Sequence, residues 1–407
     1  MSVHQSRAFT PFGAVFIIAG TAVGAAMLGL PLAAAAFTTT MTTTLLFIAW
    51  AYSLVAGFII LKLCRHYQRH DLPQMAADVL GGWAKWAMQL SFTLLCSCLL
   101  ATYSAAGGEL FVSLSKSLGF HVPHQAMVGI FGGVLGVLIY KNLQASDHLN
   151  RLLFMAKILC LCGMAWLLYD VMGPRLFSLT ILENTGHIRN PIGTLSTTFL
   201  SFMVFLASFG YHVVLPSICQ HTPDKGLGKV LVISTLIPLG MYIFWDIMVK
   251  NAVFQDAGSY GLIMDAPQQL SALLMSLGAH HPFLWVLAQW FSLFAVTTSF
   301  IGVGVALYDG MKQLCLQIRW SFVFPHQQGH SGILPFALTF AVPLLIAIFV
   351  PQLFVKGLAG AGIASTIYAM IIPGLMGCKV LETGVWKTIS LLSALGGCSI
   401  IAASLLG

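Results

Sequence analysis

The 407-residue sequence has few charged residues, and this scarcity excludes a water-soluble protein. Charged residues make up 8% of the chain and hydrophobic residues 58%, whereas a soluble domain carries about 25% charged residues. The alternating strands of about ten residues that build membrane β-barrels are also missing from the sequence. The composition therefore predicts an all-α integral membrane protein.

The sequence also lacks the motifs of a metal-dependent or intramembrane enzyme. No paired catalytic set such as His-Glu-x-x-His is present. The nine cysteines lie mostly in apolar segments without the spacing of zinc ligands, which is typical of small buried side chains. The longest outer connection, residues 250–282, leaves no room for a separate enzyme domain. We therefore expect no catalytic site, no metal and no cofactor.

Apolar segments long enough to cross a bilayer follow one another along the whole chain. A spanning helix needs about 20 mostly apolar residues, and turn residues and charges separate such segments here. We predict 11 spans, at residues 10–35, 41–63, 86–113, 124–141, 151–171, 192–219, 228–249, 283–311, 332–350, 354–376 and 385–406. Residues 1–407 are thus expected to form one transmembrane domain surrounded by lipid.

The basic residues predict the orientation. With the N-terminus in the cytoplasm, 14 of the 19 Lys and Arg residues fall on the cytoplasmic side, which is the distribution that membrane insertion favours. The N-terminus is therefore predicted to be cytoplasmic and the C-terminus periplasmic. The same bias explains the net charge of +7 without a nucleic-acid partner. Asp246 falls near the outer end of the seventh span, where we expect it at the membrane interface.

Two spans carry glycine near their middle, although glycine is a poor helix former. The first reads AGTAVGAAMLGLPLAAAA (19–36), with Gly20 and Gly24. The second reads FLASFGYHVVLPSICQ (205–220), and its Gly210 follows Gly20 by 190 residues. Gly20 and Gly24 alone also fit a packing seam of small residues. A second interruption in the sixth span favours two broken helices instead.

The positions of the two breaks predict a repeated architecture. Each interrupted span is followed by four more, and units of five spans in series must run in opposite directions. We predict inverted repeats at residues 10–171 and 192–376, with 385–406 as an extra span. Unwound backbone at such breaks presents N–H and C=O groups near the midplane, where secondary transporters bind their substrates. These groups suit a zwitterion, so the pattern favours an amino-acid-like ligand.

Lys157 is the most informative charge within a span. It lies in NRLLFMAKILCLCG (150–163), about 10 Å into the fifth span at ~1.5 Å per residue. A central lysine costs roughly 2.5–3.5 kcal/mol on insertion scales. Burial disfavours the charged form of the side chain, so Lys157 is a candidate for proton exchange. The alternative is a lysine that extends to the headgroups.

Other polar side chains leave both structural and functional interpretations open. Glu109 lies toward the outer end of the third span and is either an interfacial or a functional carboxylate. His212 follows Gly210 directly and is a candidate for ligand contact. Thr298 and Ser299 supply hydroxyls in the middle of the eighth span, unless they bond back to their own helix.

Several segments together resemble a known family. They are VFIIAGTAVGAAMLGLPLAAA (15–35), SAAGGELF (104–111), NRLLFMAKI (150–158), SFGYHVVLPSI (208–218) and TTSFIGVGVALYDGM (297–311). In this order they resemble the hydroxy and aromatic amino acid permeases of bacteria over nearly the whole chain. Glu109 and the Leu-Gly-Leu-Pro run resemble the tyrosine-transporting members more than the tryptophan-transporting ones.

The resemblance implies a LeuT-like fold, with two inverted five-helix repeats, one extra helix, and spans one and six unwound. It also implies uptake of an aromatic amino acid, tyrosine first, across the bacterial inner membrane, driven by a proton gradient. The partners expected are therefore the amino acid and the proton. A tryptophan or broad aromatic permease, a sodium-coupled relative and a non-transporting amino acid sensor are the alternatives. The sequence does not indicate an oligomeric state.

The resemblance also implies the site residues. The substrate backbone is expected at the two breaks, on Gly20, Thr21, Ala22, Val23, Gly24, Ser208, Phe209, Gly210, Tyr211 and His212. We expect Tyr103, Phe209 and Phe300 to pack against the aromatic ring. Sodium-coupled relatives hold their ion between spans one and eight, near Thr298 and Ser299 here. In proton-coupled relatives a lysine of span five fills that space, which corresponds to Lys157. Glu109 is a further candidate for proton coupling.

Overall fold

The computed structural model contains helices and no strand in the residues that it describes. These are residues 10–67, 71–141, 143–177, 195–222, 226–254, 257–265, 270–279, 281–317, 333–350, 353–382 and 384–406. The α-helices are α1 (Pro11–Ala22), α2 (Ala26–Ala33), α3 (Thr39–Tyr67), α4 (Leu72–Leu80), α5 (Gly82–Ser117), α6 (His124–Lys141), α7 (Leu143–Met172), α8 (Leu195–Ser208), α9 (Leu215–His221), α10 (Leu227–Val253), α11 (Ala257–Asp265), α12 (Leu270–Gly278), α13 (Pro282–Gln317), α14 (Ile333–Phe349), α15 (Phe354–Thr366), α16 (Ile372–Val380) and α17 (Gly384–Leu406). Short 3-10 turns, η1 (Gly173–Phe177) and η3 (Tyr211–Val214), and a π turn, η5 (Ile367–Ile371), complete them.

Local sequence explains where several helices begin. The side chain of Thr10 accepts a hydrogen bond from Gly13 N at 3.1 Å, and Pro11 occupies the first turn of α1, where its missing N–H costs nothing. Asp71 caps α4 in the same way. Gly81 separates α4 from α5 with a φ of 101°, which side chains disfavour.

Most of the predicted spans are single long helices in the structure. In the described residues, nine are long and apolar enough to cross a membrane. The helices α1 and α2 pass this test only as a pair bent by 48°, and α14 is a shorter apolar helix. Each of the 11 predicted spans corresponds to one of these segments. The chain is a multi-pass helical membrane protein, as predicted, and the total of 11 spans remains a prediction.

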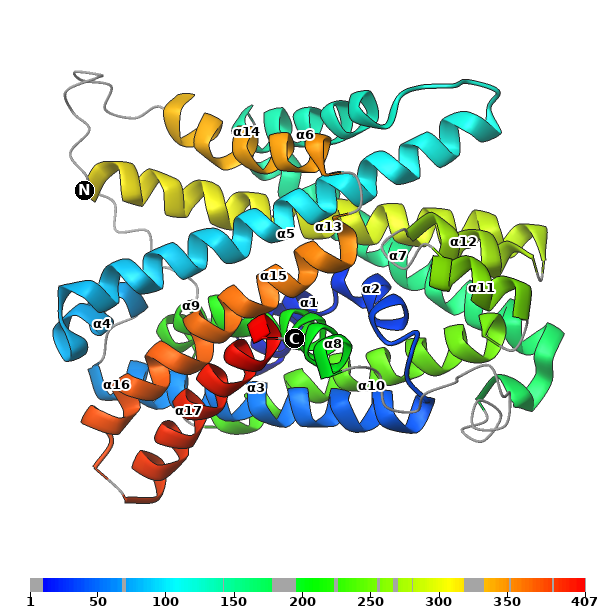
Figure 1. Cartoon of the computed structure of the whole chain (residues 1–407). Helices are drawn as coiled ribbons and strands as arrows, with labels where there is room; N and C mark the ends of the chain where they lie inside the picture. The colour runs from blue at the N-terminus through cyan, green and yellow to red at the C-terminus, as the bar shows by residue number, and fades with distance from the viewer. Residues whose placement is uncertain are drawn as a thin grey trace.

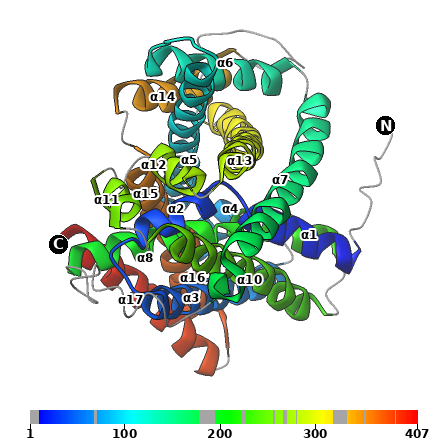
Figure 2. The ribbon, with the colours of Figure 1, turned by 90° about the vertical axis from the view of Figure 1, so that its right-hand side faces the viewer.

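The helices from the two halves of the chain are interleaved (Figure 1). Figure 2 shows α5, α6, α13 and α14 on one side, α3, α10, α16 and α17 on the other, and α2, α8 and α15 between them. Contacts agree with this arrangement, because α15 packs on α5 and α8, α2 packs on α8, and α1 packs on α10. The break and α2 therefore lie in the interior, where protein encloses their backbone, whereas α1 runs outward and exposes Phe12 and Phe16 (Figure 2).

Close contact between α8 and α15 requires glycine. A Cβ atom at Gly362 of α15 would overlap the backbone of Met203 in α8. Backbone cannot rotate away as a side chain can, so no larger residue fits without separating the two helices.

We predict that Gly362→Ala lowers the stability of the protein by about 1–3 kcal/mol, because overpacking forces the backbones apart. Gly302→Ala is the matched control, since a Cβ atom there meets nothing within 4 Å. The measurement is the apparent melting temperature of each purified variant in detergent. Equal melting temperatures for the two variants would contradict the close contact.

Candidate functional site

The first span is broken at three residues. The helix α1 ends at Ala22 and α2 begins at Ala26, so the break covers Val23, Gly24 and Ala25. Val23 N–H still donates to Ala19 O at 2.8 Å, and its ψ of 82° then leaves the helix. The structure places Gly20, Thr21 and Ala22 in the last turn of α1, so the break is later than the glycine pattern indicates. A single glycine weakens a helix by about 1 kcal/mol and does not by itself end it.

Side chains of two other helices hold the carbonyl groups at the break. Tyr242 of α10 donates its hydroxyl to Ala22 O at 2.6 Å, and Lys157 of α7 donates from Nζ to Val23 O at 3.0 Å. Lys157 is 3% exposed, and its Nζ lies 4.6 Å from the ring centroid of Phe154. Its side chain therefore points inward to the break instead of extending to the headgroups. In the described part of the chain, a carbonyl and a ring hold this ammonium group, without a carboxylate.

A side chain of α13 holds the amide group at the break. Ala25 N–H donates to Ser299 Oγ at 2.7 Å. Gly24 permits this approach, because a Cβ atom there would lie 2.6 Å from the same hydroxyl oxygen. The buried hydroxyl of Tyr103 in α5 also lies beside Ser299. The structure thus brings the predicted residues Lys157, Ser299 and Tyr103 together around the first break.

The second break is a tightened turn rather than a sharp bend. The helix α8 ends at Ser208, Phe209 N–H donates to Leu206 O at 3.2 Å, and the 3-10 turn η3 follows Gly210. Ser208 O accepts a hydrogen bond from the Tyr242 hydroxyl at 2.7 Å. The ring of Phe209 lies edge-on to that of Tyr242, with centroids 5.2 Å apart. Tyr242 therefore contacts both breaks.

Tyr211 and His212 attach the second break to α3. The Tyr211 hydroxyl and His212 Nε2 each lie 2.9 Å from Ser53 O, and their rings stack at 4.3 Å. Both side chains are buried, at 0% and 1% exposure. The structure gives these two predicted residues a contact with α3 backbone, through which they fix the position of the break.

Glu109 contacts a different part of the molecule. Its carboxylate accepts hydrogen bonds from Ser271 N at 2.8 Å and Leu270 N at 3.4 Å, so it caps α12. Glu109 lies about 9 Å further along α5 than Tyr103, at ~1.5 Å per residue. A carboxylate at a helix N-terminus stabilises that helix, which accounts for Glu109 without a proton-coupling role.

Two predicted residues of α13 do not contact the breaks in the way expected. Phe300 packs against Phe131 of α6 and Phe340 of α14, with centroids 5.6 and 6.1 Å away. Adjacent helical residues point about 100° apart, so Phe300 and Ser299 face different neighbours. The hydroxyl of Thr298 bonds back to Ala295 O at 3.0 Å, which is the structural alternative for this residue.

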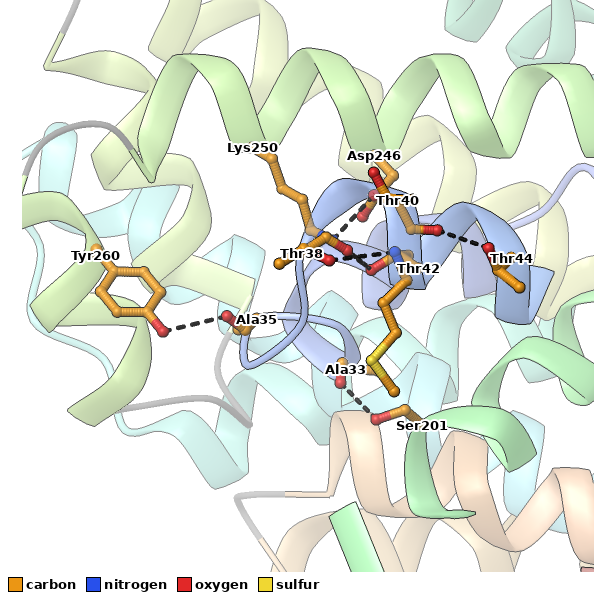
Figure 3. Close-up of polar contacts among 11 residues, drawn as sticks. Ala33, Ala35, Thr38, Thr40, Thr42, Thr44, Ser201, Asp246, Lys250 and Tyr260 are labelled. Atoms are coloured by element: carbon orange, nitrogen blue, oxygen red, sulfur yellow. Dashed lines mark hydrogen bonds and ion pairs between the residues drawn. The ribbon is translucent and has the colours of Figure 1, made fainter. Parts of the chain in front are cut away.

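The structure also contains a buried ion pair on α10. Asp246 Oδ2 and Lys250 Nζ are 3.1 Å apart, and the two side chains are 1% and 0% exposed. Neither side chain faces outward, because both turn toward α3, where Lys250 donates to Thr42 Oγ1 at 2.5 Å (Figure 3). Opposite charges four residues apart on a helix neutralise each other and so lower the cost of burial.

Two further hydrogen bonds hold the corner between α2 and α3 (Figure 3). Ser201 of α8 donates to Ala33 O at 2.6 Å, and Tyr260 of α11 donates to Ala35 O at 3.2 Å. These two bonds thus hold the C-terminal end of α2, whereas Ser299 holds Ala25 N at its N-terminal end.

Tyr242 is the site residue that the sequence pattern missed. A tyrosine in an apolar span gives no signal, because aromatic residues are common in such helices. Its spacing from Asp246 and Lys250, four and eight residues, places the three side chains on one face of α10. A polar face on an otherwise apolar span could have indicated that Tyr242 is buried against polar groups.

The sequence pattern of the tryptophan/tyrosine permease family matches residues 8–403 of this chain. The chain belongs to this family. It is 28% identical to tyrosine-specific transport system 2 of Haemophilus influenzae over 89% of this chain and 86% of that protein. It is 27% identical to the low affinity tryptophan permease of Escherichia coli K12 over 93% of this chain and 89% of that one. The protein is thus a permease of this family and not an enzyme.

The fold of this permease is similar to that of a solved structure. The inward facing conformation of Mhp1 aligns with a TM-score of 0.61 at 16% identity, covering 99% of this chain and 92% of that one. At this identity the likeness concerns the fold alone. The predicted LeuT-like fold is confirmed.

We predict that Asp246→Asn lowers stability by about 3–5 kcal/mol, because it leaves the Lys250 charge buried without its partner. The double variant Asp246→Asn with Lys250→Met should recover most of this loss. Asp309→Asn is the control, since the Asp309–Lys312 pair is 57% and 39% exposed and such pairs contribute about 0–1 kcal/mol. Melting temperatures in detergent measure all three, and equal losses for Asp246→Asn and Asp309→Asn would contradict the burial of the pair.

Proposed function

We propose that this permease imports an aromatic amino acid, L-tyrosine first, together with protons, by alternating access. The observation that carries the proposal is the contact between the Lys157 ammonium and Val23 O at the first break. It joins a buried group that can exchange a proton to the backbone that would bind the substrate. Any change in the break therefore alters the surroundings of Lys157.

The two breaks suit the backbone of an amino acid. The carbonyl groups of Ala22 and Ser208 end α1 and α8, and both point at the Tyr242 hydroxyl. Helix ends with unpaired carbonyl groups attract positive charge, so an ammonium group fits here. N–H groups at the start of α2 would receive the carboxylate, as in other transporters with broken helices.

Aromatic side chains near the breaks support an aromatic substrate. The rings of Phe209 and Tyr242 form an edge-on pair beside the second break, and Tyr103 lies beside Ser299 at the first. Aromatic rings favour such edge-on and offset contacts with one another. The relatives named above transport tyrosine and tryptophan, and the resemblance around Glu109 favours tyrosine.

Protonation of Lys157 would couple proton binding to the equilibrium between the outward-facing and inward-facing states of the carrier. A ligand shifts a conformational equilibrium only through different affinities for the two states. Protonated Lys157 holds Val23 O in the arrangement described here, and loss of the proton weakens that bond because a charged donor is stronger than a neutral one. Proton release on the cytoplasmic side would then favour return of the carrier.

The proposed orientation of the chain in the membrane follows from its basic residues. We propose inverted repeats at residues 10–171 and 192–376 in the bacterial inner membrane, with a cytoplasmic N-terminus and a periplasmic C-terminus. The distribution of Lys and Arg supports this orientation. The proton gradient would be the only driving force, with no cofactor.

A sodium-coupled permease is the second candidate. A sodium site between spans one and eight would use oxygens near Thr298 and Ser299. The ammonium of Lys157 at Val23 O puts a positive charge beside this position. A sodium ion there would be repelled, which favours the proton.

We predict that Lys157→Met folds but no longer accumulates L-tyrosine against a gradient, because the methionine fills the space without exchanging a proton. Proteoliposomes with an imposed pH gradient and labelled L-tyrosine test this. Lys116→Met is the control, since Lys116 is an exposed residue in the last turn of α5 and should leave accumulation unchanged. Proton-driven accumulation by Lys157→Met, or a sodium requirement of the wild type, would contradict the coupling.

We predict that unlabelled L-tyrosine competes best with labelled L-tyrosine uptake across a pH gradient. Tryptophan and phenylalanine should compete more weakly, and leucine least, because it has no aromatic ring to meet Phe209. The order of the inhibition constants is the measurement. Stronger competition by tryptophan would indicate a tryptophan permease instead, and absence of uptake together with tight binding would indicate a sensor.

A further inference from the structure

The Tyr242 hydroxyl lies where two helix ends meet. Its oxygen is 2.6 Å from the carbonyl oxygen of Ala22 and 2.7 Å from that of Ser208. Ala22 is the last residue of α1 and Ser208 is the last residue of α8. One side chain of α10 thus joins the two half-helices that precede the breaks.

The two helix ends favour a positively charged group with more hydrogen-bond donors than the Tyr242 hydroxyl has. Each helix end carries unpaired carbonyl groups and the negative end of a helix dipole. A phenol has a single proton to donate, so it satisfies one of the two carbonyl groups at a time. Tyr242 is 0% exposed, and Ala22 and Ser208 are 3% and 1% exposed. An ammonium group, with three donors and a positive charge, would satisfy both carbonyl groups together.

We propose that Tyr242 is a positioning residue of the carrier whose hydroxyl takes the place of the substrate ammonium while the carrier is empty. It keeps the carbonyl oxygens of Ala22 and Ser208 close enough for a single donor to contact both. When substrate arrives, its ammonium group binds both carbonyl groups and the hydroxyl oxygen becomes an additional acceptor. This inference rests on the proposed function, because it assigns a role within the same site.

The proposal separates two steps of the transport cycle. A loaded carrier has the substrate ammonium to join the two half-helices, so it reorients without the Tyr242 hydroxyl. An empty carrier has only Tyr242. Removal of the hydroxyl should therefore impair the empty step and leave the loaded step intact, whereas a merely structural hydrogen bond would affect both alike.

The test is Tyr242→Phe in proteoliposomes, measured in net uptake and in counterflow of labelled L-tyrosine. Net uptake requires the empty carrier to return, whereas counterflow exchanges substrate without an empty step. We expect net uptake to fall roughly tenfold or more, because a buried carbonyl group loses its donor. Counterflow should stay within about twofold of the wild type, since bound substrate supplies the donor. Tyr52→Phe is the matched control, because Tyr52 is also a tyrosine within a span and donates to the backbone of Ser393.

Stability provides a second readout that does not depend on transport. If Tyr242→Phe folds poorly, L-tyrosine during purification should restore the folded yield, and 3-(4-hydroxyphenyl)propionate, which lacks the ammonium group, should not. Equal losses in net uptake and counterflow, unchanged net uptake, or equal rescue by both compounds would overturn the proposal. Failure of the proposed function is distinguishable, because the wild type would then show neither uptake nor counterflow.

Discussion

The structure depends on one constraint: the backbone groups at the first break must find partners inside the membrane. Unpaired N–H and C=O groups cost several kcal/mol each in hydrocarbon, so a spanning helix is interrupted only where other groups replace its own hydrogen bonds. Here the replacements come from three helices. Tyr242, Lys157 and Ser299 bind Ala22 O, Val23 O and Ala25 N respectively. The positions of α7, α10 and α13 around α1 and α2 follow from these bonds.

Because side chains supply these hydrogen bonds, a ligand can replace them at the first break. Backbone hydrogen bonds within a helix are released only when the helix unwinds, whereas side-chain donors can be exchanged for those of a ligand. Tyr242 contacts both breaks, and Lys157 contacts the first through its amino group. Substrate and proton would therefore act on the same short segment, which links the binding of one to the binding of the other. Tyr211 and His212, which both contact Ser53 O, attach the second break to α3.

Much of this arrangement could be predicted from local features of the sequence. Glycines in mid-span indicated both breaks, and a lysine within an apolar segment indicated Lys157, because each contradicts the rules for an ordinary spanning helix. Features that depend on contacts distant in sequence could not be predicted. Glu109 caps a helix that begins 161 residues later, and Phe300 faces α6 and α14 because of how α13 is rotated. The sequence likewise placed the start of the break three residues early, since the helix continues through Gly20 until Lys157 and Tyr242 replace its bonds.

The direct test of the substrate site is a structure of the permease with L-tyrosine bound. The ammonium group of the substrate should lie within hydrogen-bonding distance of both Ala22 O and Ser208 O, with the Tyr242 oxygen beside it and the aromatic ring against Phe209. An amino acid bound away from the two breaks, or one whose ammonium group contacts neither carbonyl oxygen, would contradict a substrate site at the two helix ends.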